Sequence, residues 1–177
     1  GHADTFSLIR NMPFTFLNAS ICDTTGQLLF YTNGIYVANR NHDTLLNSPG
    51  FNPGYFTNYY YNYGIAIDQG ALVIPFPGEK SSYYIFHESA EVVQIDTQAA
   101  AHPLNLSFSI VDMNHDGGLG GIISSAKDIH AIDDTLVLGR LSAVKHANGR
   151  DWWVICHRFF SNTFYKLLIT PSGVSMY

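Results

Sequence analysis

Five tyrosines close together in the sequence are the side chains best suited to binding. Tyr residues at positions 55, 59, 60, 61 and 63 fall within one short segment, and two asparagines lie among them. Aromatic rings stack on sugar rings, while amide and phenol groups hydrogen-bond sugar hydroxyls, so this composition suits a glycan or a surface protein as partner. The alternative is that the rings only cover an edge of the fold. The candidate ligand-binding residues are Tyr55, Asn58, Tyr59, Tyr60, Tyr61, Asn62 and Tyr63.

A second pattern is typical of a metal site. Asp112, Asn114 and Asp116 precede Gly117 and match the first half of a calcium loop, in which alternate oxygen ligands converge and a glycine allows a sharp turn. Ile123 stands where such a loop carries its bidentate Glu, so the strongest ligand is missing. The alternative is a polar turn that bonds its own backbone. These three residues are thus candidate ligands of a calcium ion, and we expect no other cofactor.

Hydrolytic chemistry would require a histidine, a carboxylate and a nucleophile brought together from separate loops. The best candidates are His130 with Asp133 or Asp134, in the ionisable segment 128–134, which we expect to be a loop. The chain lacks G-x-S-x-G, H-E-x-x-H, P-loop and G-x-G-x-x-G motifs. His87 and His157 end two segments of equal length, so we expect them to be equivalent positions of the repeat with structural roles. We therefore expect a non-catalytic protein and keep a His/Asp hydrolase as an alternative.

The composition limits the classes of partner. Charged residues make up 13% of the 177 residues, aromatic residues 14%, and the net charge is −5 with nine basic side chains. A nucleic-acid or anionic-membrane surface needs clustered Lys and Arg, so neither is an expected partner. No apolar run approaches the ~20 residues of a membrane helix, so we expect no membrane insertion. Cys22 and Cys156 lie in separate strand-like runs, and we expect two buried free thiols.

A repeated pattern predicts the elements that must position these residues. The segments 71–87 and 141–157 each contain an apolar run, a turn with Gly, a second run and a final His, which is typical of a β-hairpin. A third copy runs from Ala19 to Asn33. The predicted fold is all-β, a partial β-propeller of about three antiparallel blades at 17–68, 69–136 and 137–177 within a single segment 1–177; a β-sandwich is the alternative. Segment 90–101 is the best helix candidate.

Three blades do not close a ring. The terminal blades of such a segment would each expose a sheet face to solvent. We therefore expect either that the propeller continues in a longer parent chain or that the chain forms a homo-oligomer.

Four ordered strings carry a resemblance to a known group of proteins. They are ASICDTTGQLLFYTNG, QGALVIPFPGEKSSYYIFH, FSIVDMNHDGGLGG and LSAVKHANGRDWWVICH. Over about residues 19–173 the chain resembles the N-terminal β-propeller-like region of large secreted Bacteroidetes proteins that end in a type IX secretion (gliding-motility-associated) sorting domain. The resemblance implies an extracellular or outer-surface location and a longer parent protein. Together with the repeats and the low charge, it favours a scaffold or adhesion role. A carbohydrate-binding, lectin-like role is the alternative that the tyrosines favour.

Overall fold

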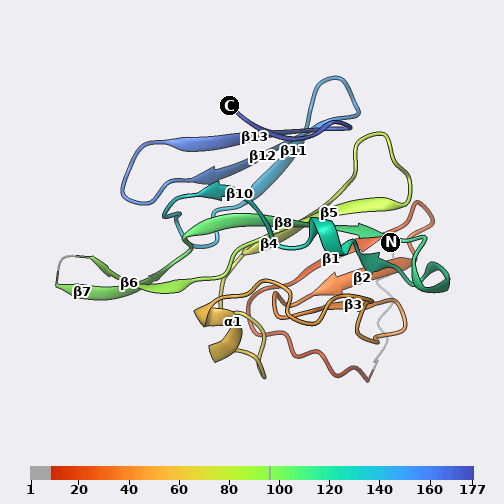
Figure 1. Ribbon diagram of the computed structural model, residues 1–177, viewed down its shortest axis with the longest axis horizontal. Helices are drawn as coiled ribbons and strands as arrows, with labels where there is room; N and C mark the ends of the chain where they lie inside the picture. Colours follow the sequence, from red (N-terminus) through yellow and green to blue (C-terminus); the bar gives the residue numbers. More distant parts are fainter. Residues whose placement is uncertain (1–8, 96) are drawn as a thin grey trace, which may run out of the picture.

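The computed structural model describes residues 9–95 and 97–177 and confirms the expected all-β class, with antiparallel sheets (Figure 1). Three sheets follow one another along the chain. The first contains β1 (Ala19–Cys22), β2 (Leu28–Thr32) and β3 (Val37–Asn39). The middle sheet has the order β10 (Ile129–Asp133), β8 (Asn105–Asp112), β5 (Ser82–His87), β4 (Ala71–Pro75), with β9 (Gly121–Ile122) beside β8. The last sheet contains β11 (Ser142–Lys145), β12 (Trp152–His157), β13 (Phe164–Thr170) and β14 (Gly173–Met176).

Smaller elements complete the chain. A separate hairpin of β6 (Glu91–Ile95) and β7 (Gln98–His102) projects from the middle sheet (Figure 1). Helix α1 (Tyr55–Tyr59) lies below the middle sheet in the same view. Two single turns of 3-10 helix span Asp116–Gly118 and Ser124–Ala126. Within the described residues, no helix is long and apolar enough to cross a membrane.

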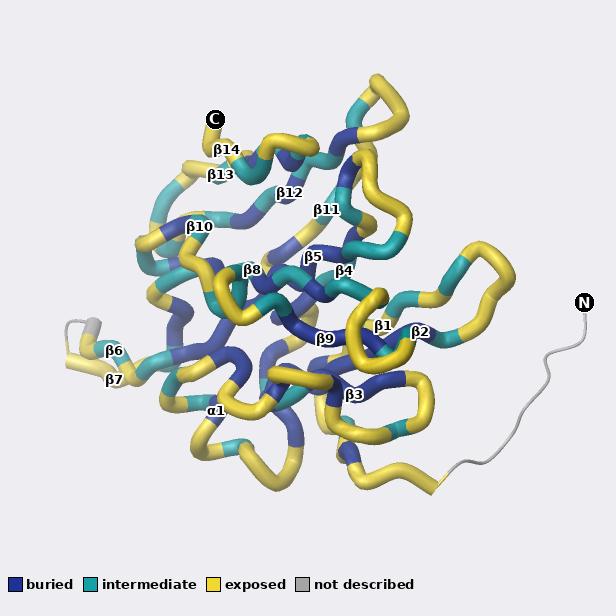
Figure 2. The backbone as a smooth tube through the Cα atoms, turned by 45° about the vertical axis from the view of Figure 1, so that its right-hand side comes forward, coloured by how far each residue is buried: buried dark blue, intermediate teal, exposed yellow. Residues whose placement is uncertain are grey.

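The middle sheet is covered on both faces. Tyr83 and Ile85 of β5 pack with Phe30 of the first sheet, whereas Tyr84 and Phe86 pack with the last sheet. Alternating side chains of one strand therefore enter two different cores, because successive residues of a strand point to opposite faces. Burying each such side chain contributes roughly 1.5–3 kcal/mol. Strand β5 is buried from Tyr83 to His87, whereas buried and half-buried residues are mixed along β8, shown dark blue and teal in Figure 2.

The first strands of the three sheets lie next to one another. Contacts join β1 to β4 and β4 to β11. This arrangement is compatible with blades around a common axis and also with the packed sheets of a sandwich. The three sheets occupy residues 19–39, 71–133 and 142–176, and each lies inside one of the three segments predicted from the repeats.

The two matching hairpins differ by one residue in register. Ala71 pairs with His87 in the middle sheet, whereas Lys145 pairs with Trp152 in the last sheet, so the second turn is one residue shorter. A shift of one residue exchanges the two faces of a strand. Cys156 is buried in the core between the sheets, and His157 points to the other face and is only partly buried. The expectation that His87 and His157 are equivalent is therefore wrong: Cys156 takes the place that His87 has.

Three other expectations need correction. Segment 90–101, the helix candidate, forms most of the β6–β7 hairpin, because Val92 and Val93 favour extended backbone. The predicted loop at 128–134 contains strand β10. Cys156 is buried as expected, but Cys22 is exposed, since it ends β1, an edge strand with alternating exposed residues. Neither cysteine forms a disulfide.

Candidate functional site

The tyrosine segment forms an exposed aromatic surface around α1. Tyr55, Tyr59, Tyr61 and Tyr63 are 44–66% exposed, whereas Tyr60 is partly buried. The two asparagines among them are also exposed. Below, "the tyrosine surface" means Tyr55, Asn58, Tyr59, Tyr60, Tyr61, Asn62 and Tyr63. The structure therefore brings together all seven predicted ligand-binding residues.

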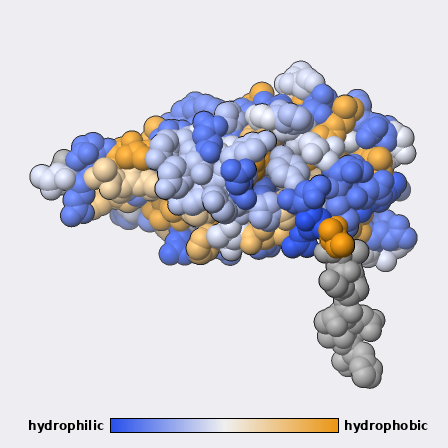
Figure 3. Space-filling view, turned by 90° about the horizontal axis from the view of Figure 1, so that it is seen from below, coloured by the Kyte–Doolittle hydropathy of each residue, from blue (hydrophilic) through white to orange (hydrophobic). Residues whose placement is uncertain are grey.

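Ring contacts fix part of the tyrosine surface. The rings of Tyr55 and Tyr59 are stacked, with centroids 5.8 Å apart and an angle of 22° between their planes. Tyr60 lies edge-on to Tyr59 at 5.0 Å and to Phe56 at 5.1 Å. Such pairs contribute about 0.5–1.5 kcal/mol beyond their buried area, so these rings are held in place before any ligand arrives. Figure 3 shows the underside of the molecule in Figure 1, the side of α1, where blue and pale colours alternate with orange patches.

Hydrogen bonds from the backbone of α1 tie it to the segment that follows β5. The Phe56 N–H donates to the Ala90 carbonyl at 3.0 Å, and the Tyr55 N–H donates to Glu91 Oε1 at 2.8 Å. Thr15 donates to the Tyr63 carbonyl. A helix of one turn is unstable by itself, so these contacts and the buried groups beneath must hold its shape.

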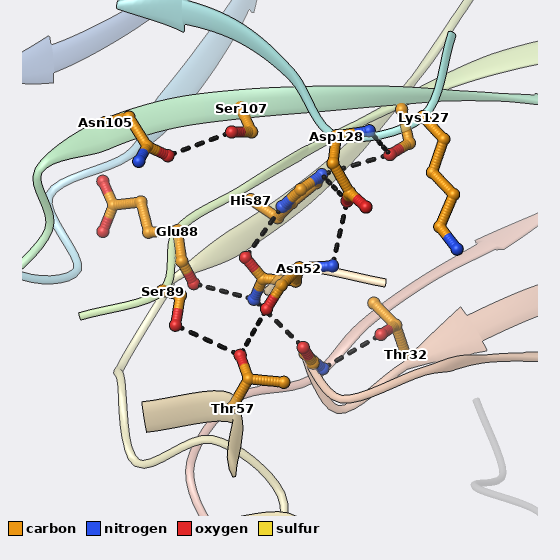
Figure 4. Close-up of polar contacts among 12 residues, drawn as sticks. Thr32, Asn52, Thr57, His87, Glu88, Ser89, Asn105, Ser107, Lys127 and Asp128 are labelled. Atoms are coloured by element: carbon orange, nitrogen blue, oxygen red, sulfur yellow. Dashed lines mark hydrogen bonds and ion pairs between the residues drawn. The ribbon is translucent and has the colours of Figure 1, made fainter. Parts of the chain in front are cut away.

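A buried polar network lies between α1 and the middle sheet (Figure 4). Its centre is Asn52, whose side-chain amide donates to the carbonyls of Gly34 and Glu88, each at 3.0 Å. The Asn52 carbonyl accepts a hydrogen bond from Thr57 of α1. Asn52 is almost fully buried and has a φ of 54°, a left-handed conformation that Asn tolerates better than most residues. The network thus joins the first sheet, the middle sheet and the tyrosine surface.

His87 connects this network to the middle sheet. Its Nδ1 lies 2.9 Å from Asn52 Oδ1, an acceptor, so the Nδ1 carries the proton in the neutral ring. Its Nε2 lies 3.2 Å from the Ser109 hydroxyl on β8 and 3.4 Å from Asp128 Oδ1. Complete burial, and to a lesser degree the charge of His130, lowers the pKa of His87 to about 3. The ring is therefore a neutral structural element at neutral pH, in agreement with its expected structural role.

We expect Asn52→Ala to lower the free energy of unfolding by about 3 kcal/mol, because two buried carbonyls and the His87 ring lose their partner. Urea unfolding followed by fluorescence measures the change. Asn52→Gly is the matched variant, since Gly adopts positive φ without strain and isolates the loss of the amide. Losses below about 1 kcal/mol in both variants would show that the network is not needed for stability.

Glu88 is a second buried ionisable group beside the network. The side chain is fully buried, its Oε2 accepts a hydrogen bond from the Gly139 N–H at 3.2 Å, and its Oε1 has no partner among the described residues. Burial raises the pKa of Glu88 to about 8, while the Gly139 hydrogen bond opposes the shift. Glu88 is therefore mainly a neutral acid at neutral pH.

The proposed calcium loop forms a turn with internal hydrogen bonds. Asp112 Oδ1 accepts from both the backbone and the side-chain nitrogen of Asn114, each at 2.9 Å, and the Asn114 side chain also donates to Ser81. Asp116 has a φ of 50° and begins a turn of 3-10 helix. In residues 9–95 and 97–177, no group of three or more His, Cys, Asp or Glu side chains is arranged to hold a metal ion. The geometry favours the polar-turn alternative, and calcium at Asp112, Asn114 and Asp116 stays a prediction.

Two of the three hydrolase candidates, His130 and Asp133, lie close together. His130 Nδ1 lies 2.6 Å from Asp133 Oδ1, and a bulge between His130 and Ile132 brings these two side chains to the same side of β10. Both side chains are at least half exposed, at 51% and 75%. Asp134 is engaged elsewhere, by the Tyr165 hydroxyl and by Arg158 at 2.9 Å. The pair is a solvated surface contact and does not lie in an enclosed pocket of the kind that usually surrounds catalytic residues.

Several residues of the site carry no recognisable sequence signal. Asn52, Ser109 and Asp128 meet His87 from three segments that are distant in the chain. Each is a common polar residue in a loop or strand, and only the tertiary fold brings them together. The run His87-Glu88-Ser89 directly after an apolar strand was the one available signal, because three polar residues there must find partners if they are buried.

Comparison of the chain with protein-family models, with curated proteins and with solved structures finds no match.

Proposed function

We propose that this chain is a non-catalytic β-repeat module of an extracellular or cell-surface protein that holds a partner through its tyrosine surface. One observation carries the proposal: the four exposed tyrosines and two exposed asparagines lie on one segment that buried hydrogen bonds anchor to two sheets. An anchored surface loses little conformational entropy on binding, which favours affinity. A glycan is the partner that rings combined with amides favour most, and a surface protein is the other candidate.

The direct test is binding of the labelled protein to a broad glycan array in the presence and absence of calcium. We expect a specific set of glycans to bind, and the double variant Tyr59→Ala, Tyr61→Ala to lose at least tenfold in affinity, because two exposed rings no longer stack on the sugar. Titration of the best glycan measures the loss. The melting temperature should fall by only a few degrees, because both rings are mainly in solvent and only Tyr59 loses ring contacts, with Tyr55 and Tyr60.

Tyr177→Ala is the matched control for that variant. Tyr177 is 66% exposed, as is Tyr61, and lies on the last sheet, so its loss should leave binding unchanged. Equal affinity of the double variant and the unaltered protein would exclude the tyrosine surface as the binding site. A calcium requirement lost in Asp112→Asn would support the metal prediction.

We also propose that the stack of sheets continues beyond the last sheet, in a longer parent chain or in a second copy. On its outer face, Val144 of β11 pairs with Trp153 of β12, which pairs with Leu168 of β13. Val144 is 55% exposed, and Trp153 and Leu168 are partly exposed. The outer face of the first sheet is covered instead, because Met12 and Phe14 pack against Tyr31. One end of the stack is thus capped and the other is not, as in a repeat array that continues in one direction.

A further inference from the structure

The segment with Met12 and Phe14 that covers the outer face of the first sheet leaves a cavity of about 480 Å³ beside that sheet. None of the residues that line the cavity belongs to the tyrosine surface. The cavity is lined by the segment that contains Arg10 and Phe14, by the first residues of β1 and by Tyr31 of β2. This volume lies in the range of small-molecule sites. The side chains that line it and can recognise a ligand are Arg10, Phe14, Asn18, Ser20, Tyr31 and His42.

Positive charge and hydrogen-bond donors converge on this cavity. The Arg10 guanidinium lies 4.5 Å above the Phe14 ring, and its Nε donates to the Met12 carbonyl at 3.4 Å. These contacts orient a charge that would otherwise move freely in solvent. Among the described residues that line the cavity, none is an Asp or Glu, although the whole chain has a net charge of −5. The cavity is therefore a locally positive site on an acidic protein.

His42 is held toward the cavity by an unusual backbone. Its φ is 70°, a left-handed conformation that is uncommon for residues other than glycine, and strain of this kind often accompanies binding sites. The Tyr31 hydroxyl lies 2.8 Å from His42 Nδ1. In the tautomer in which the Tyr31 hydroxyl donates to Nδ1, the ring proton is on Nε2, and this nitrogen can donate to a ligand. The Tyr31 ring itself lies 5.8 Å from the Phe14 ring, so an apolar wall faces the donors.

We propose that this cavity binds a small carboxylate that carries hydroxyl groups on a ring, the chemistry of a hexuronic acid. The Arg10 guanidinium pairs with the carboxylate, for which its planar fork is suited. Ser20, Asn18 and His42 hydrogen-bond the ring hydroxyls, and the apolar face of the sugar ring packs on Phe14. A neutral sugar offers no negative charge to the Arg10 guanidinium, so the site discriminates between acidic and neutral sugars by charge.

The experiment is a calorimetric titration of the whole chain with glucuronate, galacturonate, glucose and acetate. We expect saturable binding of at least one hexuronate, at least tenfold weaker binding of glucose, and at least tenfold weaker binding of acetate, which has the charge without the ring. Arg10→Ala should weaken hexuronate binding at least tenfold. Arg140→Ala, which removes an exposed arginine outside the cavity, should leave the affinity unchanged.

Several outcomes would overturn the proposal. They are the absence of saturable hexuronate binding below about 10 mM, equal binding of glucose, equal binding of acetate, and full affinity in Arg10→Ala. Amide chemical shifts measured by NMR must move at Ser20 and His42 on titration; shifts confined to the tyrosine surface would also refute this site. The test uses monomeric ligands and Arg10, so it can fail while the glycan array and the Tyr59 and Tyr61 variants still succeed, or the reverse.

Discussion

Gly139→Ala is expected to unfold the protein or to reduce its free energy of unfolding by about 4 kcal/mol or more. A Cβ atom at Gly139 would lie 1.8 Å from the Asp68 carbonyl oxygen, a backbone atom that cannot rotate away. The backbone must shift, and the hydrogen bond from the Gly139 N–H to Glu88 would be lost with it. Thermal unfolding followed by circular dichroism, with soluble yield as a second reading, measures the effect.

Gly149→Ala provides the matched control. Gly149 also has a positive φ, 73° against 64° at Gly139, but a Cβ there meets no atom within 4 Å. Gly149→Ala should therefore lower the free energy of unfolding by only about 1 kcal/mol, the cost of placing a non-glycine residue in the left-handed conformation. Similar losses in the two variants would mean that backbone conformation alone explains the Gly139 result. In that case Gly139, which precedes the last sheet, would not need to be a glycine because of its close approach to Asp68.

Glu88→Gln is expected to stabilise the protein strongly at alkaline pH. The folded-state pKa of Glu88, about 8, lies above its ordinary value of 4.5, which the unfolded chain should show. Below pH 4.5 the carboxyl is protonated in both states and costs nothing. As pH rises from 4.5 to 8 the unfolded state releases the proton and the folded state keeps it, so stability is lost across this window. At about 1.36 kcal/mol per pKa unit, the full loss is on the order of 5 kcal/mol, and Gln avoids it.

Urea unfolding of Glu88→Gln and of the unaltered protein, over a series of pH values, measures this difference. The two proteins should be nearly equally stable at acid pH and should diverge until about pH 8, after which the gap stays constant. Glu79→Gln removes an exposed carboxyl after β4 and is the control, which should show no divergence. A gap that is the same at every pH would show that Glu88 does not keep its proton in the folded state.

The elements were largely predictable from the sequence because each depends on neighbouring residues. The continuous apolar runs in Ala71–Pro75 and Trp152–His157 predict strands, and Asn148-Gly149 predicts the turn between two of them. The 90–101 segment was ambiguous because alanines favour helix and valines favour strand. The one-residue difference between the two hairpins was hidden, since the two segments have equal length and only the pairing shows which residues face each other.

The candidate site was predictable only at its surface. Tyrosines that cluster in a loop are visible in the sequence, and four of the five are indeed exposed. The support beneath them was not visible, because Asn52 reaches His87 and Glu88 across more than thirty residues of chain. The cavity beside Tyr31 was missed for the same reason. Arg10 precedes the first sheet in the sequence, His42 follows it, and neither belongs to a motif.

The shorter turn of the second hairpin has a consequence for how such chains change during evolution. Inserting or deleting one codon in the turn between two strands exchanges, in a single event, the residues that face the interior and those that face solvent. The change from a pattern with His87 inside to one with Cys156 inside needs no substitution along the strand itself. Repeated hairpins can therefore diverge in their interiors by mutations in their loops, and alignments without gaps would compare residues that lie on opposite faces.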